Sequence, residues 1–383
     1  MHQSANSTCA GKRSDEELAN LAKRIGTPLY IYDLGRLRNR IIELRTTFRQ
    51  AGAKLFFATM ANDRLQVLRL LARYGVGACV NSLPHLQLAR KAGFHTSAIQ
   101  FTSTGMTRAD MKVAQDLGVR VNLDSLQQLE TWLALGASEA GIRINAASLG
   151  RNGRADRIGM DASELHLAQG IAKHYRSKIT GLHIYVGTNF QTPDQMLPTL
   201  NAFFDLAGAL VSIAYINIGG GIGVNYAHRG PAFDLPAFGK GLATCANKLR
   251  SRLGRNVEII VEPGRYFVAD CAVFLTTVTD RKRLAGKDIA AVDGSVSVFP
   301  RPFHHPDTPH QIRPLTRPGQ NGHRRRKMLV VGRTTFSRDI LGSSLLPSNL
   351  RSGDLIVISD AGAYSASMAS RFLGQPEPHE IFL

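Results

Sequence analysis

Two short motifs in the second half of the chain carry groups suited to binding a charged ligand. Gly219-Gly220-Gly221-Ile222-Gly223 is rich in glycine, which lets backbone N–H groups approach an anion closely. Glu262-Pro263-Gly264-Arg265 places a carboxylate and a guanidinium three residues apart. The guanidinium of Arg265 suits a phosphate, and the carboxylate of Glu262 suits a protonated ring nitrogen. A ligand-free tight turn and a solvent-exposed ion pair are the alternative interpretations.

Both motifs follow short apolar runs that recur with nearly constant spacing. The first five runs begin close to residues 55, 77, 98, 119 and 141, and three more occupy 179–186, 213–218 and 257–261. This spacing accommodates one strand, one helix and two loops, so eight such units predict a (β/α)8 TIM-like barrel. A doubly wound open sheet is the alternative. In a barrel the active site lies at the carboxyl ends of the strands, which is where both motifs fall.

The pattern changes after Arg265, where helical periodicity fades. Runs such as Cys271–Thr279, Met328–Val331 and Asp354–Ser359 alternate with Gly/Pro turns, which predicts a C-terminal all-β domain. We therefore expect an N-terminal segment over 1–26, a barrel over 27–265 and a β domain over 266–383. The segment 28–33 is strand-like and suited to pairing with the β domain.

Composition narrows the class of protein. A hydrophobic fraction of 44% and a charged fraction of 20% exclude a disordered chain. The four cysteines are scattered, no metal-ligand spacing is present, and no signal peptide or membrane span is apparent, so we expect a cytoplasmic protein. The net charge of +18 suggests an anionic partner. Its densest window, 301–330, holds five prolines and predicts a solvated loop, which disfavours nucleic-acid recognition.

Taken in order, the motifs resemble the fold-type III pyridoxal-phosphate decarboxylases, the group of diaminopimelate, ornithine and arginine decarboxylases. The resemblance also includes Thr27–Asp33, Phe57-Ala58 with Ala61-Asn62, Gly181-Leu182-His183, Arg301-Pro302 and Gly362-Ala363-Tyr364. It implies an alanine racemase-like barrel with a β domain, and a homodimer with active sites at the subunit boundary. It implies pyridoxal 5'-phosphate as the cofactor, held by Gly219, Gly220, Gly221, Glu262, Arg265, Tyr364, Arg143 and Thr188.

The departures from this family pattern lie at the reacting centre. Met60 occupies the position of the lysine that forms the Schiff base, and Lys54 is six residues upstream, roughly 20 Å away along a strand. Tyr185 replaces a histidine that stacks on the cofactor ring, and Cys79 replaces an acid. The cysteine and acid that a partner subunit contributes align with Thr335 and Phe336. A deliberate Lys→Met replacement would explain one position but not the others.

Groups expected to hold the cofactor are therefore present, whereas groups expected to make and break bonds are changed. The first hypothesis is a decarboxylase of a basic or diamino acid, such as diaminopimelate or ornithine, impaired by the loss of its lysine. A second is a catalytically silent homologue that binds the cofactor, or its adduct with an amino acid, as a regulatory or carrier partner. A third is a basic interaction protein whose 301–330 loop binds polyanions.

Overall fold

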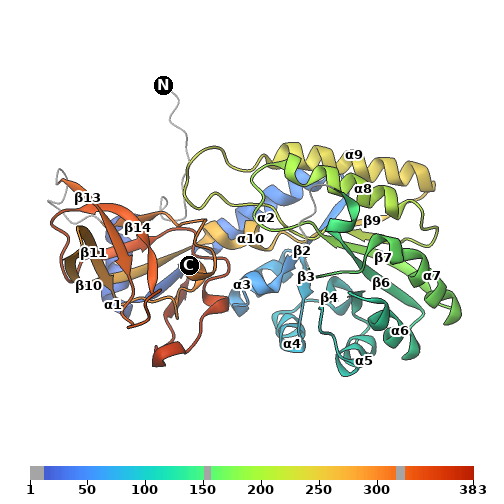
Figure 1. Cartoon of the computed structure of the whole chain (residues 1–383), viewed down its shortest axis with the longest axis horizontal. Coiled ribbons are helices and arrows are strands. Elements are labelled where there is room, and N and C mark those ends of the chain that lie inside the picture. Colours follow the sequence, from blue (N-terminus) through green and yellow to red (C-terminus); the bar gives the residue numbers. More distant parts are fainter. Residues whose placement is uncertain (1–12, 151–156, 316–323) are drawn as a thin grey trace. The chain divides into compact units, whose positions relative to one another are not determined.

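The computed structural model describes residues 13–150, 157–315 and 324–383, which form two compact units (Figure 1). The barrel unit comprises 40–224 and 232–266. The C-terminal unit comprises the described part of 1–39 together with 225–231 and 267–383. The segments 27–39 and 225–231, which the strand and helix pattern assigns to the barrel, thus group with the C-terminal unit.

Eight parallel strands close into a barrel, which confirms the predicted fold. Strand β9 pairs with β2 in the register Ala53↔Ile259, and this pairing closes the ring. The strands lie within a few residues of the predicted apolar runs. In chain order they are β2 (Ala53–Ala58), β3 (Gly77–Val80), β4 (Ile99–Thr102), β5 (Arg120–Leu123), β6 (Glu139–Asn145), β7 (Lys178–Tyr185), β8 (Tyr215–Asn217) and β9 (Glu258–Val261).

Helices connect the strands and begin at recognisable caps. The Ser82 hydroxyl accepts a hydrogen bond from the N–H of His85, and Pro84 occupies the first turn. No described helix is long and apolar enough to cross a membrane. The helices from the barrel's start are α2 (Leu34–Phe48), α3 (Leu65–Arg73), α4 (Leu83–Ala92), α5 (Arg108–Asp116), α6 (Leu126–Ala134), α7 (Leu165–His174), α8 (Leu197–Ala207), α9 (Leu235–Leu253) and α10 (Gly264–Val268).

A buried tyrosine fills one level of the barrel interior. The Tyr215 hydroxyl donates to Asn122 Oδ1 at 2.9 Å. A Cβ on Gly181 would lie 1.9 Å from Tyr215 Cζ, and one on Gly141 would lie 2.0 Å from the hydroxyl. These two glycines therefore make room for the ring, because real Cβ atoms do not approach other atoms so closely.

The C-terminal unit is built on a mixed sheet. Its strand order is β12-β15-β10-β11-β13-β14, and β1 joins β10 to β16. Helix α1 (Asp15–Ile25) packs Leu18 and Ala22 against Val273 and Leu275. The strands are β1 (Leu29–Tyr32), β10 (Ala272–Leu284), β11 (Lys287–Val292), β12 (Ile312–Pro314), β13 (Arg325–Val331), β14 (Ile340–Pro347), β15 (Leu355–Ile358) and β16 (His379–Phe382).

The prediction of a solvated loop over 301–330 is wrong for both ends of that window. Arg301 begins the short helix α11 (Arg301–His304) and is fully buried. Its guanidinium lies 3.3 Å from the centre of the Tyr226 ring and donates to the Thr308 carbonyl at 3.0 Å. Ring stacking and hydrogen bonds thus replace water around the charge. Strands β12 and β13 occupy 312–314 and 325–331, and 316–323 lie outside the described residues.

We predict that Gly181→Ala lowers the free energy of unfolding by about 2–3 kcal/mol, because the added methyl overlaps the Tyr215 ring in a filled interior. Urea denaturation measures this change. Gly170→Ala is the matched control: Gly170 lies exposed in α7, where a Cβ meets nothing within 4 Å. That substitution should raise the free energy of unfolding by about 0.5–1 kcal/mol. Similar effects of the two substitutions would contradict the steric explanation.

Candidate active site

The glycine motif forms a tight loop directly after β8. Gly219 and Gly221 have φ values of 65° and 98°, a region that favours glycine. A Cβ on Gly219 would lie 2.4 Å from the Ile184 carbonyl oxygen, and one on Gly220 would lie 2.5 Å from that of Glu262. The backbone therefore lies against the ends of β7 and β9. Among described residues, the N–H groups of Gly220 and Gly221 have no backbone acceptor.

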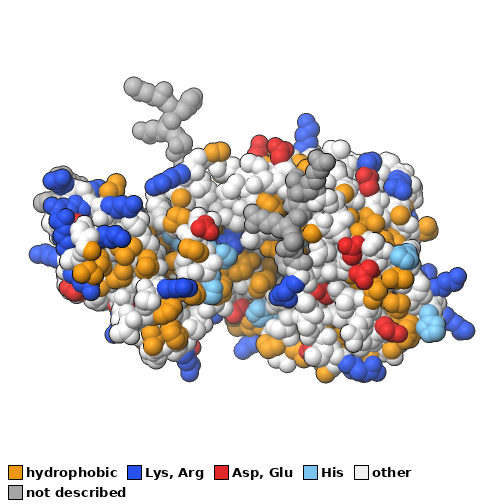
Figure 2. All heavy atoms as spheres, in the orientation of Figure 1, with side chains coloured by type: hydrophobic (Ala, Val, Ile, Leu, Met, Phe, Trp, Pro, Cys, Tyr) orange, Lys and Arg blue, Asp and Glu red, His pale blue; other side chains and the backbone are white. Residues whose placement is uncertain are grey.

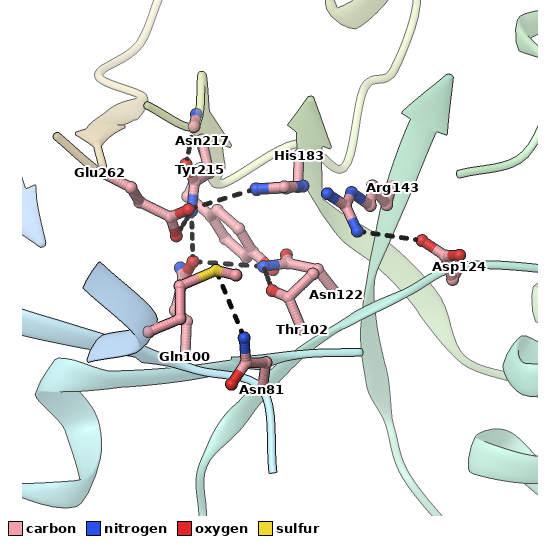
Figure 3. A network of polar contacts seen from close by, with 12 residues as sticks. Asn81, Gln100, Thr102, Asn122, Asp124, Arg143, His183, Tyr215, Asn217 and Glu262 are labelled. Atoms are coloured by element: carbon pink, nitrogen blue, oxygen red, sulfur yellow. Dashed lines mark hydrogen bonds and ion pairs between the residues drawn. The ribbon is translucent and has the colours of Figure 1, made fainter. Parts of the chain in front are cut away.

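Glu262 follows β9 and is almost completely buried at the barrel mouth (Figure 3). Asn217 Nδ2 donates to Glu262 Oε1 at 2.5 Å, and His183 Nε2 lies 3.4 Å from Oε2. Burial alone would raise the pKa of Glu262, but hydrogen bonds from His183, Asn217 and Cys79 outweigh burial and lower it. The carboxylate is therefore charged although it is removed from water.

His183 is the neutral partner of this carboxylate. Burial lowers the pKa of His183 below its ordinary value, and the nearby Glu262 only partly offsets that effect. A neutral ring with its proton on Nε2 donates to Glu262, which leaves Nδ1 as an acceptor. Nδ1 is buried and has no hydrogen-bond partner among the described residues. In the sequence His183 is only part of the motif Gly181-Leu182-His183, and no role was predicted for it.

Three buried amides, which were not predicted from the sequence, extend this network through the barrel. Asn217 Nδ2 also donates to Gln100 Oε1 at 2.5 Å. Asn122 Nδ2 donates to Gln100 Oε1 at 3.3 Å and to Thr102 Oγ1 at 2.8 Å. Gly219 N–H donates to Asn217 Oδ1 at 2.8 Å, so one amide contacts both Glu262 and the glycine loop. The sequence signal that could have identified these three residues is an amide side chain within an otherwise apolar strand.

Arg143 and Tyr185 lie on the adjacent strands β6 and β7. Arg143 Nη1 lies 3.4 Å from Asp124 Oδ1, and its Cζ lies 5.9 Å from the centre of the Tyr185 ring. Cys79 on β3 faces Glu262, and burial followed by that negative charge raises the pKa of the thiol well above its usual value. Cys79 is therefore a neutral donor at the position where the resemblance implies an acid.

Arg265 lies in α10, three residues after Glu262, and is 6% exposed. Its Nη2 donates to Thr188 Oγ1 at 3.4 Å. The barrel unit thus brings Arg265 and Thr188 together, as two of the residues that the resemblance assigns to the cofactor. Since the Thr188 side chain is exposed, a ligand phosphate at this point would have access to both groups.

Met60 lies in a single turn, η2 (Thr59–Ala61), directly after β2, and is 48% exposed. Its sulfur accepts a hydrogen bond from Asn81 Nδ2 at 3.5 Å. Lys54 lies near the opposite end of β2 and forms an ion pair with Glu258, the first residue of β9. The described lysines of the barrel unit all lie on helices or near the start of a strand: Lys54, Lys91, Lys112, Lys173, Lys178, Lys240 and Lys248.

Two expected site residues belong to the C-terminal unit. Tyr364 has a φ of 54° and follows the Asp360–Ala363 turn. Thr335 is exposed in the loop between β13 and β14. That loop is held by Asp339, whose carboxylate accepts from the Thr334 N–H at 3.0 Å and the Val296 N–H at 2.8 Å. The roles of Tyr364 and Thr335 stay predictions.

Comparison with known proteins now decides the family. Residues 34–269, well over half of the chain, match the family described as "Pyridoxal-dependent decarboxylase, pyridoxal binding domain". The chain belongs to this family of pyridoxal-dependent decarboxylases. Its cofactor is pyridoxal 5'-phosphate.

Similar members of the decarboxylase family match along almost their whole length. Diaminopimelate decarboxylase of Methanothermobacter thermautotrophicus is 28% identical, over 96% of this chain and 89% of that protein. L-glutamyl-[BtrI acyl-carrier protein] decarboxylase of Niallia circulans is 28% identical, over 95% of this chain and 90% of that protein. The crystal structure of Helicobacter pylori diaminopimelate decarboxylase with L-lysine superposes with a TM-score of 0.85 at 26% identity, covering 96% and 94% of the two chains.

The residues of the barrel mouth fit this cofactor except at one point. The glycine loop, which any Cβ would fill, and the Arg265 guanidinium suit a phosphate. The buried, charged Glu262 suits a protonated pyridine nitrogen. The thioether of Met60 cannot form the covalent bond to the cofactor that a lysine amine forms. Among the described residues of the barrel mouth, the site therefore fits the cofactor's two charged ends, and Met60 offers no amine for a covalent bond.

We predict that acid destabilises the fold partly through His183. Its folded pKa lies below its ordinary value of 6.5, so as the pH falls below about 6.5 the unfolded chain binds a proton that the folded chain does not. The free energy of unfolding should therefore decrease from about pH 6.5 downward. His183→Gln, which keeps an amide donor toward Glu262, should make that slope shallower. Urea denaturation at several pH values measures it.

The matched control is His174→Gln, which removes an exposed imidazole at the end of α7. It should reproduce the wild-type slope. A wild-type slope in His183→Gln would show that the buried ring takes up its proton equally in the folded and unfolded chains, and would contradict the prediction.

Proposed function

We propose that this chain binds pyridoxal 5'-phosphate at its barrel mouth and acts as a decarboxylase of a basic or diamino acid, with turnover limited by Met60. The observation that carries the proposal is the buried, charged carboxylate of Glu262 beside a glycine cradle. Such a carboxylate is costly to bury and is useful where a cation must be held. The family and the names of the relatives support the reaction class.

Residues of the barrel unit would divide the work of holding the cofactor. The N–H groups of the glycine loop and the Arg265 guanidinium would bind its phosphate. Glu262 would keep the ring nitrogen protonated, while His183 and Asn217 hold that carboxylate in place. The Tyr185 ring offers a flat surface for stacking. When bound, the protonated pyridine ring of the cofactor withdraws electrons from an attached amino acid.

The same site is poorly equipped for exchanging its amino acid and for moving protons. Met60 cannot displace a bound amine, because a thioether has no N–H. The phenol of Tyr185 is a much weaker acid than the imidazolium of a histidine, so it is a poor proton donor near neutral pH. A hydroxyl at Thr335 is a weaker acid than the thiol that the resemblance implies there. Slow turnover, limited by entry and exit of the amino acid, follows from these changes.

A catalytically silent homologue is the second candidate, because none of the described lysines of the barrel unit lies at the carboxyl end of a strand. Such a protein would hold the cofactor or its adduct with an amino acid as a carrier or regulatory partner. Treatment of the cofactor-loaded protein with borohydride separates the two candidates. A reduced adduct on any lysine-containing peptide would exclude the silent protein.

The proposed substrate is a diamino acid, since diaminopimelate decarboxylases are among the similar proteins. The relative from Niallia circulans is named for a glutamyl group on an acyl-carrier protein. A carrier-bound amino acid is therefore the second substrate to be tested. We also propose a homodimer in which a partner contributes the loop containing Thr335. The cytoplasmic location expected from the sequence stays a prediction.

We predict that Arg265→Ala weakens cofactor binding by about tenfold to a hundredfold, because it removes a charged donor to the phosphate. Titration with pyridoxal 5'-phosphate, followed by absorbance, measures the change. Arg90→Ala, on the exposed surface of α4, is the control and should bind like the wild type. Unchanged binding by a folded Arg265→Ala protein would place the phosphate elsewhere.

We predict that Met60→Lys restores covalent attachment. The position is 48% exposed at the end of β2, so a lysine side chain fits without displacing packed neighbours. The variant should become yellow with the cofactor, yield a borohydride-fixed adduct at position 60, and release carbon dioxide from a diamino acid at least about tenfold faster than the wild type. Met60→Gln, a polar control without a nucleophilic amine, should do none of these.

Two results of that comparison would count against the proposal. A wild-type protein as fast as Met60→Lys would show that turnover is not limited at this position. A Met60→Lys protein that attaches the cofactor but releases no carbon dioxide from diaminopimelate, lysine, ornithine, arginine or carrier-bound glutamate would exclude the decarboxylase and favour the silent homologue.

A further inference from the structure

The C-terminal unit has a sheet face on which cations and aliphatic side chains alternate. Side chains opposite each other in a ladder share a face, and the registers pair Leu284 with Lys287 and Lys327 with Leu345. Strand alternation extends this face across β10, β11, β13 and β14. We call it the outer β face, and it consists of Lys282, Leu284, Lys287, Ile289, Arg325, Lys327, Leu329 and Leu345.

The opposite side of these strands is the core. Ala290, Met328 and Leu346 are fully buried there. Three arginines lie on that side, Arg281, Arg283 and Arg326, and two of them, Arg281 and Arg326, lie 3.8 and 3.7 Å from the oxygens of Asp288. Two of the three inner arginines are therefore paired with an acid of the same sheet.

Charge on the outer β face is not balanced in this way. Its four cations, Lys282, Lys287, Arg325 and Lys327, form no ion pair with a described residue. Strand alternation adds one acid to the face, at position 280 on β10.

Exposed aliphatic side chains lie among these cations. Leu284 is 63% exposed and Leu345 is 58% exposed. In Figure 2 hydrophobic and basic side chains intermingle over the region of β13 and β14. Unpaired cations and exposed aliphatic side chains thus share one sheet face, which suits a partner that has both charged and apolar groups.

We propose that the outer β face binds an acidic amphipathic α-helix of a partner protein. A sheet face buries its apolar side chains most readily under a helix, because helix-on-sheet layers are a standard packing arrangement. Acidic residues flanking the apolar stripe of that helix would meet Lys282, Lys287 and Lys327. Their attraction would fix the orientation of the helix and speed its association.

Other occupants fit this surface less well. None of the eight side chains is aromatic or an amide, so Arg325 is the one member of this set that could stack on or read a nucleic-acid base. A second copy would bring the same excess of positive charge against itself. An anionic membrane would attract the cations, but a flat sheet inserts little hydrocarbon. The proposal does not depend on the proposed decarboxylase activity, because every residue of the face lies in the C-terminal unit.

The experiment uses the full-length protein and a fluorescein-labelled synthetic peptide of about 18 residues, with leucines on one helical face and glutamates flanking them. Fluorescence anisotropy measures binding. A peptide of the same composition but scrambled order keeps the charge and loses the apolar face. The helical peptide should bind at least about tenfold more tightly than the scrambled peptide, and rising salt should weaken its binding.

Two substitutions on the face test the charge and the hydrocarbon separately. The double variant Lys282→Glu with Lys327→Glu should weaken binding at least about tenfold. Leu345→Ser should weaken it about threefold to tenfold through lost apolar contact. Lys91→Glu on α4 and Leu167→Ser on α7, where Leu167 is 48% exposed, are matched controls that should bind like the wild type.

Three outcomes would overturn the proposal. Equal affinity for the helical and scrambled peptides would show non-specific attraction to negative charge. Tighter binding of the protein to phosphatidylglycerol vesicles or to a single-stranded RNA than to the peptide, lost in the same variants, would assign the face to that partner. A change of oligomeric state in Leu345→Ser, measured by light scattering and accompanied by wild-type peptide binding, would assign it to a second copy.

Discussion

A charged carboxylate held out of water organises the mouth of this barrel. Burying an isolated ion costs several kcal/mol, so Glu262 keeps its charge only because donors on neighbouring strands surround it. His183 comes from β7 and Asn217 from β8. The position of the carboxylate therefore depends on three strands at once, β7, β8 and β9.

The groups suited to binding the cofactor differ physically from the groups that a reaction would require. Groups that stabilise fixed charge, namely the glycine loop, Glu262 and Arg265, are present and well supported. Met60, Tyr185 and a neutral Cys79 occupy positions where the resemblance implies groups that make bonds, move protons or carry an acid. Binding a cofactor requires complementary charge and shape, whereas turnover requires nucleophiles and acids of suitable pKa. A chain can therefore keep the first property while losing the second.

The barrel was predictable because each of its eight units contains a short apolar run at nearly constant spacing. That spacing is a local property of the sequence and does not depend on contacts between distant residues. The glycine loop and Glu262 were predictable for a related reason, since unusual residue types mark them. Arg301 was not, because its burial depends on Tyr226 and Thr308, which no local pattern connects to it. The network of Gln100, Asn122 and Asn217 also escaped prediction, since its hydrogen bonds join side chains of β4, β5 and β8 that no local pattern connects.

The amide network also connects opposite walls of the barrel. Strands β4 and β8 stand four places apart in a ring of eight, so they form opposite walls of the barrel. The Gln100–Asn217 hydrogen bond thus crosses the interior of the barrel from one wall to the other. Asn217 also donates to the Glu262 carboxylate and accepts from the Gly219 N–H. A tilt of the β4 wall would therefore be transmitted to Glu262 and the glycine loop through the Gln100–Asn217 hydrogen bond.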